Sequence, residues 1–352
     1  YDKLILIIKN LIDKGILVNE FSKLIKSDNK TFILNTDQSS IINLLNKEII
    51  LKKPQYLGDI NKYLSELSIQ INIFLSEGIN SENLIMNKGT KIYGTNISIT
   101  LDDNNPYNVF NAHPDHKNTG GYISYGVKTE DEWLKIYEKT FSLLKKVDTG
   151  IYSELNKIIK KIIPLGTSVG VHNSASYKEA IGHLYLGYTI SSDMPEINNL
   201  EAIIHESSHN KLNLIMQFDE VVLNTKEEIY YSAIRPDARH IYGVFIGYHA
   251  FAPTMYIIMK AYYEGFFGEN KYWLEKIVLY HIKTKFLQKV IKKYAKLTPL
   301  GEEISKEIDF VISNMDILLK KLNPGVDIIS RAKDLQIKHF NEVNLNYPYL
   351  KY

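Results

Sequence analysis

Residues 200–215 read LEAIIHESSHNKLNLI, with two histidines four residues apart and Glu206 directly after the first. Apolar residues at helical spacing around this motif predict an α-helix. Residues four apart lie one above the other on a helix, so His205 and His209 project from one face toward one metal ion. Glu206 lies about 100° away, where it can meet a metal-bound water without being a ligand. The alternative is a pair of polar residues on a surface helix.

The HExxH spacing matches the motif in which zinc peptidases use two histidines as ligands and the glutamate as general base. The chain contains no cysteine, so thiolate sites, disulfides and a cysteine nucleophile are excluded. Any metal must therefore be held by imidazole and carboxylate groups.

Composition indicates an ordinary globular protein. Of the 352 residues, 45% are hydrophobic and 23% charged, and the formal net charge is +2. Near-balanced charge argues against nucleic acid or an anionic membrane as a partner. Charged residues or Asn interrupt each apolar run before it reaches the length of a membrane span. The first residues, YDKLILIIKNLIDKG, are typical of an amphipathic helix, not a signal peptide, and we expect a cytoplasmic protein.

We predict a predominantly α-helical α+β fold, with a small β-sheet packed against the HExxH helix. Residues 1–90 form an N-terminal helical region of unknown role, and residues 91–352 form the metal-binding catalytic domain. Alternation after Thr90 predicts a strand, and a helical pattern runs from Glu130 to Ile163, where Pro164 ends it. The other expected elements are a strand over 182–190, the HExxH helix with Asn198 as N-cap, a long buried helix from about 238 to 268, and further helices to the C-terminus.

Two histidines do not complete a metal site, so a third ligand is required. The metzincin continuation is excluded because Leu212 and Ile215 replace its glycine and histidine. A thermolysin-like site takes a downstream glutamate on a following helix as its third ligand, and Glu227 or Glu228 lies at a suitable distance along the sequence. However, the surrounding KEEIYY segment is short, charged and expected to be a loop. We favour His249, which lies in the most apolar helix, where an unpartnered imidazole is costly to bury.

The neighbourhood of His249 also bears on the site. Pro253 cannot donate a hydrogen bond to the carbonyl of His249, which predicts a kink in this helix. Three histidines are compatible with zinc, and nitrogen ligands with open positions also suit non-haem Fe(II).

Arginine is rare in this lysine-rich chain, yet Arg235 and Arg239 fall four residues apart in SAIRPDARHIYG. The planar guanidinium suits carboxylate binding, which would fit α-ketoglutarate near an iron. The alternative is a structural pair, for example with Asp237.

Several stretches, in order, resemble the HExxH-motif peptide-modification proteins of ribosomal peptide clusters, a family associated with α-ketoglutarate-dependent peptide β-hydroxylation. The matching stretches are ITLDDNNPYN, the helix at Trp133, IIPLG, SASYKEAIGHLYLGY, IIHESSHNKLNLI and SAIRPDARHIYGVFIGYHAF, which together cover about residues 95–265. The chain has His240 where the family often has proline after the second arginine, and Ile246 where some members have histidine.

The resemblance implies that His205, His209 and His249 bind Fe(II), that Arg235 or Arg239 holds α-ketoglutarate, and that O2 is the co-reactant. Glu206 would orient a ligand or water. Independently of the resemblance, Ser176 would face the cosubstrate if the strand at Gly182 lines the cleft, as the strand before HExxH does in zincins. The expected partner is a precursor peptide, with its leader as a candidate binding segment. The alternatives are a zinc metallopeptidase with Glu206 as general base, and a non-catalytic leader-binding scaffold.

Overall fold

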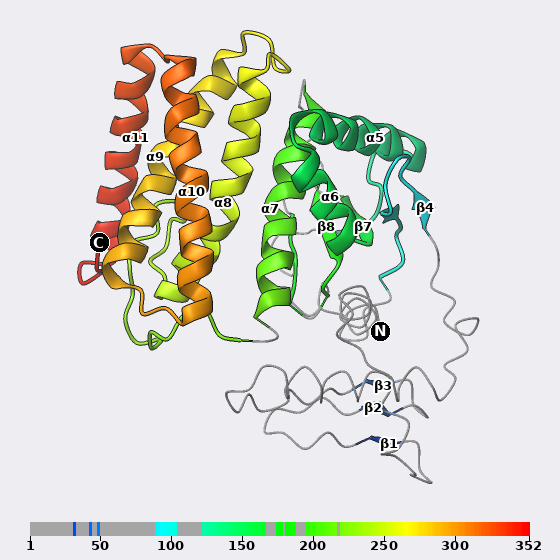
Figure 1. Ribbon diagram of the computed structural model, residues 1–352, viewed down its shortest axis with the longest axis horizontal. Helices are drawn as coiled ribbons and strands as arrows, with labels where there is room; N and C mark the ends of the chain where they lie inside the picture. The colour runs from blue at the N-terminus through cyan, green and yellow to red at the C-terminus, as the bar shows by residue number, and fades with distance from the viewer. Residues whose placement is uncertain are drawn as a thin grey trace.

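The structure, a computed structural model, has a predominantly α-helical α+β fold, as predicted (Figure 1). It describes residues 89–103, 122–166, 174–178, 180–187, 194–216 and 219–352. Before residue 89 it describes only a small antiparallel sheet of β1 (Thr31–Phe32), β2 (Ile42–Asn43) and β3 (Glu48–Ile49). The rest of the predicted N-terminal helical region lies outside the described residues.

Helices make up most of the described chain. They are α5 (Glu130–Val147), α6 (Thr149–Ile158), α7 (Pro195–Ile215), α8 (Ile241–Tyr263), α9 (Lys271–Tyr294), α10 (Pro299–Leu322) and α11 (Val326–Asn346). The helix expected around the HExxH motif is α7, the long apolar helix is α8, and the helical C-terminal third is confirmed.

A mixed five-stranded sheet accompanies these helices. Its strands are β4 (Thr90–Lys91), β5 (Ser98–Ile99), β6 (Tyr122–Ile123), β7 (Lys161–Gly166) and β8 (His183–Gly187). Strand β7 is central: it pairs in parallel with β5 and β8 and antiparallel with β6. The strand predicted over 182–190 is β8 where the structure describes it, and residues 188–190 lie outside the described residues.

The prediction of one helix from Glu130 to Ile163 is wrong. Asp148 ends α5, and its side chain starts α6 by accepting a hydrogen bond from the backbone N–H of Ile151 at 2.9 Å. Residues 161–166 form strand β7, which is buried along its whole length. A strand buried on both faces reads as a continuous apolar run and lacks the alternation that identifies half-buried strands.

Pro164 lies inside β7 and does not end a helix. The carbonyls of Ile162 and Pro164 accept hydrogen bonds from Thr100, at the end of β5, and from Ser124, next to β6. The nitrogen of Pro164 therefore faces the edge of β7 where pairing passes from β5 to β6. Pro164 supplies no N–H to either strand, so the change of partner from β5 to β6 coincides with the position of β7 that cannot donate to the ladder.

The start of α7 also differs from the prediction. The helix begins at Pro195, one turn before the predicted N-cap Asn198, and Met194 is its N-cap residue. Proline suits the first helical position because its missing N–H has no partner inside the helix.

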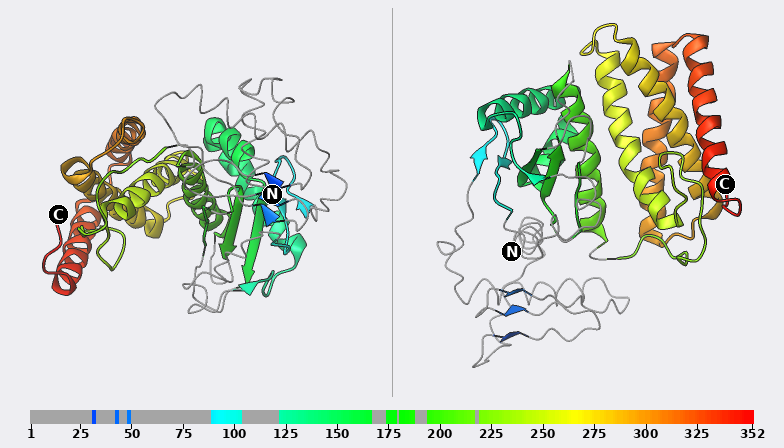
Figure 2. Two further views of the ribbon diagram at one scale, coloured as in Figure 1. Left: turned by 90° about the horizontal axis from the view of Figure 1, so that it is seen from below. Right: turned by 180° about the vertical axis from the view of Figure 1, so that it is seen from behind.

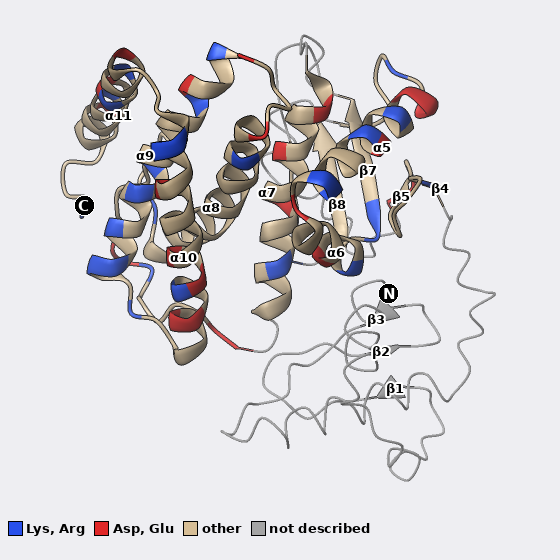
Figure 3. Ribbon diagram, turned by 45° about the horizontal axis from the view of Figure 1, so that its top comes forward, with Lys and Arg blue, Asp and Glu red and all other residues tan. Residues whose placement is uncertain are grey.

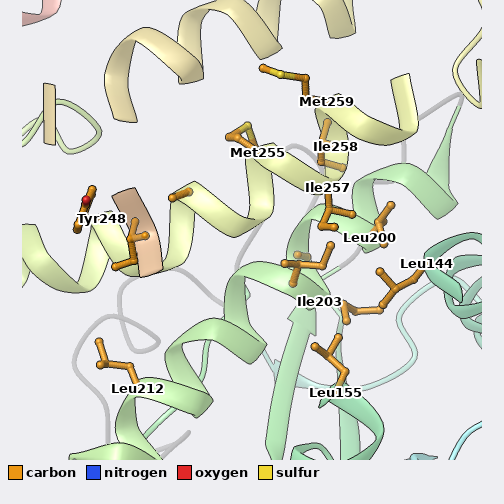
Figure 4. Packing of buried hydrophobic residues seen from close by; sticks show 14 of the residues in the cluster. Leu144, Leu155, Leu200, Ile203, Leu212, Tyr248, Met255, Ile257, Ile258 and Met259 are labelled. Carbon is orange, nitrogen blue, oxygen red and sulfur yellow. The ribbon is translucent and has the colours of Figure 1, made fainter. Parts of the chain in front are cut away.

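Helix α7 is the centre of the molecule (Figures 1 and 2). The sheet, α5 and α6 lie on one side of it, and α8 to α11 lie on the other. Leu200 and Ile203 of α7 are buried near Ile257 of α8 (Figure 4). Burying each such side chain contributes about 2 kcal/mol before the cost of ordering the chain is subtracted.

The expectation that charged residues or Asn interrupt each apolar run is wrong for residues 241–259, which contain none. Within the described part of the chain, α8 is the one helix long and apolar enough to span a membrane by length and composition. Most of it is buried against α7, α9 and α10, as in the core helix of a globular protein. One main core cluster includes residues from Ile92 to Leu350.

Candidate metal centre

The two histidines of the HExxH motif meet on one face of α7. The Nε2 atoms of His205 and His209 lie 3.1 Å apart, and both side chains are half-buried. Burial lowers the pKa of His209 to about 4, so this imidazole is neutral at pH 7. Two neutral rings this close either share a proton in a hydrogen bond or direct both lone pairs at one cation.

Glu206 does not share the environment of the histidines. Its carboxyl group is buried, and Oε2 accepts a hydrogen bond of 2.8 Å from the hydroxyl of Ser176. Burial raises the pKa of Glu206 to about 7, although the bond from Ser176 opposes the shift. Ser176 thus contacts Glu206, and its predicted contact with a cosubstrate stays a prediction.

Asn210 makes a second contact from the same side of α7. Its side chain is fully buried; Oδ1 accepts from the backbone N–H of Gly182 at 2.7 Å, and Nδ2 donates to the carbonyl of His183 at 3.0 Å. Gly182 has φ of +86°, a conformation that glycine adopts without strain, and it leads directly into β8. The amide of Asn210 thus joins α7 to the start of β8.

The contacts of Glu206 and Asn210 converge on one strand. Ala175, next to Ser176, forms two backbone hydrogen bonds with Tyr185 of β8, at 2.8 and 3.0 Å. Glu206 and Asn210 are four residues apart, as are His205 and His209, and each pair occupies its own side of α7. Glu206 is hydrogen-bonded to Ser176 beside β8, and Asn210 is hydrogen-bonded to the start of β8. These bonds restrict the rotation of α7, so the histidines are held on the adjacent face of the helix.

Asn210 is not among the site residues predicted from the sequence. The available signal was its position four residues after Glu206, which repeats the spacing of the histidines.

Aromatic rings from two helices lie beside His205. The ring of His205 meets the edge of Phe251 of α8, with centroids 4.6 Å apart, and Phe251 stacks on Tyr280 of α9 at 5.5 Å. Burial, followed by the charge of Glu201, raises the pKa of Tyr280 to about 12. An aromatic wall from α8 and α9 therefore lies beside His205.

His249, the predicted third ligand, is buried in α8, and its Nδ1 has no hydrogen-bond partner among the described residues. Burial lowers its pKa to about 3, with smaller contributions from the charges of Lys211 and His209. Phe251, two residues later on α8, contacts His205. Because charge effects between side chains act over short distances, the effect of His209 on the pKa of His249 places His249 in the neighbourhood of the pair.

No group of three His, Asp or Glu side chains in the described segments is arranged to hold a metal ion. The structure brings His205 and His209 together and places His249 near His209, and ligation by His249 stays a prediction.

The two arginines of the SAIRPDARHIYG segment are engaged with Asp237. Nε of Arg235 lies 3.3 Å from Oδ1 of Asp237, and Nε of Arg239 lies 2.6 Å from Oδ2. These contacts match the structural pairing considered as the alternative to cosubstrate binding.

The other ligand candidates, Glu227 and Glu228, lie in an irregular segment, as predicted. Both are exposed, and Glu228 is bonded to Tyr230 and Lys351.

Comparison with known proteins gives no further assignment: no family model matches the chain, and no curated protein matches it.

Proposed function

We propose that the His205–His209 pair binds Fe(II) and that the protein catalyses α-ketoglutarate-dependent hydroxylation, at the β-carbon, of a side chain in a ribosomally made precursor peptide. The observation that carries the metal site is the 3.1 Å separation of the two Nε2 atoms. The iron, the keto acid and the peptide are expectations from the sequence resemblance.

The two imidazoles fit a metal ion. Ligands at about 2.1 Å from a metal and about 90° apart are separated by about 3.0 Å, close to the separation here. His209 is neutral at pH 7, which is the form that coordinates. His249 supplies a third neutral imidazole on the neighbouring helix, near enough to His209 for the charge of His209 to lower its pKa.

Bound Fe(II), together with α-ketoglutarate and O2, would supply the oxidising power to replace an unactivated C–H bond by C–OH. The protein would orient the reactants and exclude water. Phe251 contacts His205 and presents an apolar surface next to the pair. Ser176 and Asn210 hold the adjacent side of α7 through their hydrogen bonds to Glu206 and Gly182.

The role of Glu206 differs between the hydroxylase proposed here and a hydrolytic enzyme. In a zinc peptidase the glutamate must take a proton from a water at the metal. Here Glu206 is buried and bonded to Ser176, an arrangement that favours an orienting role. The zinc metallopeptidase stays the second candidate because burial places the pKa of Glu206 at about 7, which suits a general base at neutral pH.

Turnover of α-ketoglutarate tests the proposal. Metal-free protein is loaded with Fe(II), supplied with α-ketoglutarate and O2, and succinate is measured with and without candidate precursor peptides. We expect succinate formation that requires Fe(II) and is lost in His205→Ala. A zinc-loaded protein that cleaves peptides, loses cleavage in Glu206→Gln and forms no succinate with iron would replace the hydroxylase by the peptidase.

A further inference from the structure

Phe251 of α8 lies in direct contact with the histidine pair. Its ring meets the ring of His205 with centroids 4.6 Å apart, and the ring of Tyr280 stacks on it at 5.5 Å, with an angle of 16° between the two planes. Phe251 is half-buried, so part of its surface is open to a ligand. A ligand of a metal at the histidine pair therefore has an aromatic surface beside it.

Gly247 lies one turn before Phe251 on the same side of α8. Helices α7 and α8 run antiparallel (Figures 1 and 4). One turn back from Phe251 on α8 thus corresponds to one turn forward from His205 on α7, which is the turn of His209. Side chains of a helix lean toward its N-terminus, so the ring of Phe251 leans toward the turn of Gly247.

Packing does not explain why residue 247 lacks a side chain. Among the described residues, a Cβ on Gly247 would meet only Cδ1 of Leu287 on α9, at 3.9 Å, which is an ordinary van der Waals contact. The backbone of Gly247 is part of α8 and has no positive φ, so alanine would adopt the same conformation. Glycine inside a helix is less stable than alanine. The chain thus keeps space beside Phe251 at a cost in helix stability, as sites for ligands do.

The groups around this space are apolar or aromatic. Leu287 is fully buried, Phe251 and Tyr280 contribute their rings, and Gly247 contributes backbone alone. Helix α8 carries a single charged residue, Lys260, more than two turns after Phe251, and most of the helix is tan in Figure 3. An aliphatic or aromatic side chain gains free energy when it is buried against such a surface.

The charged groups of α9 lie next to Tyr280. Lys276 and Lys283 lie 5.9 and 5.3 Å from the centroid of that ring, and Lys276 is paired with Glu201 at 2.5 Å. In the part of the chain that the structure describes, no ammonium or guanidinium group lies over the ring of Phe251. Burying a charged side chain against Phe251 would therefore cost its hydration.

We propose that the peptide substrate places an aliphatic or aromatic side chain, such as that of leucine or phenylalanine, against Phe251 in the space that Gly247 leaves open. Phe251 and Gly247 are then the residues that determine specificity. The inference rests on the proposed function, which supplies the metal and the peptide, and it adds the class of side chain that is modified.

Relaxation of probe protons near a paramagnetic metal tests the inference. Protein loaded with Co(II) is titrated with the N-acetyl methylamides of leucine, phenylalanine, aspartate and lysine, with Zn(II)-loaded protein as the diamagnetic reference. We expect Co(II) to accelerate the relaxation of the leucine and phenylalanine probes, which should bind about tenfold more tightly than the other two. Equal binding of all four probes, tighter binding of a charged probe, or no acceleration of the two apolar probes would overturn the inference.

Variants of Phe251 and Gly247 provide the second measurement. Phe251→Ala removes the aromatic surface, and Phe286→Ala makes the same change at a half-buried ring of α9 that meets Tyr231. We expect Phe251→Ala, and not Phe286→Ala, to weaken binding of the leucine and phenylalanine probes about tenfold. Gly247→Leu should fill the space and weaken the same probes while Co(II) affinity is kept. Equal probe affinities in the two alanine variants would contradict the inference.

The two proposals fail in different ways. Saturation-transfer measurements with the same four probes on metal-free protein make the comparison independent of the metal. If Fe(II) and α-ketoglutarate form no complex while the leucine and phenylalanine probes still bind and Phe251→Ala weakens them, the hydroxylase is excluded and the apolar specificity stands. If the complex forms and all four probes bind alike, the apolar specificity is excluded and the hydroxylase stands.

Discussion

The hydroxyl of Ser176 lies 2.8 Å from Oε2 of Glu206 and holds a buried carboxyl group in place on the face of α7 next to the histidines. This contact connects the segment beside β8 to the HExxH motif. It also decides which way Glu206 points in the metal-free protein.

Removing that hydroxyl should destabilise the protein. Ser176→Ala leaves a buried carboxyl oxygen without its donor, and we expect the free energy of unfolding to fall by about 1–3 kcal/mol. Ser207→Ala is a matched control, because Ser207 is also buried and its Oγ has no hydrogen-bond partner among the described residues. Urea denaturation of both variants measures the difference. Similar losses in the two variants would mean that the Ser176–Glu206 bond contributes nothing.

The histidines of α7 should differ sharply from His249 in their effect on metal binding. His205→Ala and His209→Ala each remove one of two converging nitrogens, and we expect each to lower the affinity for a divalent metal by about 100-fold or more. His249→Ala should have a smaller effect, because the nitrogens of His205 and His209 already converge while no group of three described His, Asp or Glu side chains is arranged to hold a metal. Calorimetric titration with Co(II) measures the affinities. An equally large loss in His249→Ala would show that His249 is the third ligand.

Asn210 should affect the geometry of the metal site as well as stability. Asn210→Ala removes two buried hydrogen bonds to the start of β8, which should cost about 3 kcal/mol and weaken Co(II) binding by about tenfold. Thr284→Val is the control: Thr284 is fully buried and bonded only within α9, to the carbonyl of Tyr280. The visible spectrum of bound Co(II) should change in Asn210→Ala alone. An unchanged spectrum and affinity would assign Asn210 a purely structural role.

Asp309 should make the helical half of the molecule sensitive to acid. It accepts hydrogen bonds from Tyr248 of α8 and Gln288 of α9, at 2.5 and 2.6 Å, and pairs with Lys292. Burial alone would raise the pKa of Asp309, but these partners together hold it below its usual value.

Because the folded state has the lower pKa, the stabilisation by Asp309 is present above the unfolded pKa of about 4 and is lost as pH falls through the folded pKa. Asp309→Asn should therefore be less stable than the wild type at pH 7, with a difference that shrinks in acid. Denaturation at a series of pH values checks this, and a difference independent of pH would contradict it.

The sequence predicts most of the helices and one half of the site. The periodicity of residues 200–215 identifies α7, and the spacing of His205 and His209 predicts that their rings meet. It does not predict β7, because a strand buried on both faces lacks alternation and because Pro164 resembles a helix terminus unless the pairing of its neighbours is known.

The tertiary contacts of the site residues also cannot be predicted from the sequence. Which side of α8 faces His205 depends on the packing of α7, α8 and α9, and an apolar helix with aromatic residues on most sides gives no indication of it. The partner of Glu206 is a serine 30 residues away in the sequence, brought close by the pairing of Ala175 with Tyr185.

The most direct test of the central claim is an anaerobic titration of metal-free protein with Fe(II) and α-ketoglutarate, followed in the visible spectrum. We predict a weak charge-transfer band that needs both components and is absent from His205→Ala. No band in the wild type, together with zinc retained tightly through purification, would contradict the hydroxylase and leave the peptidase as the function of the HExxH motif.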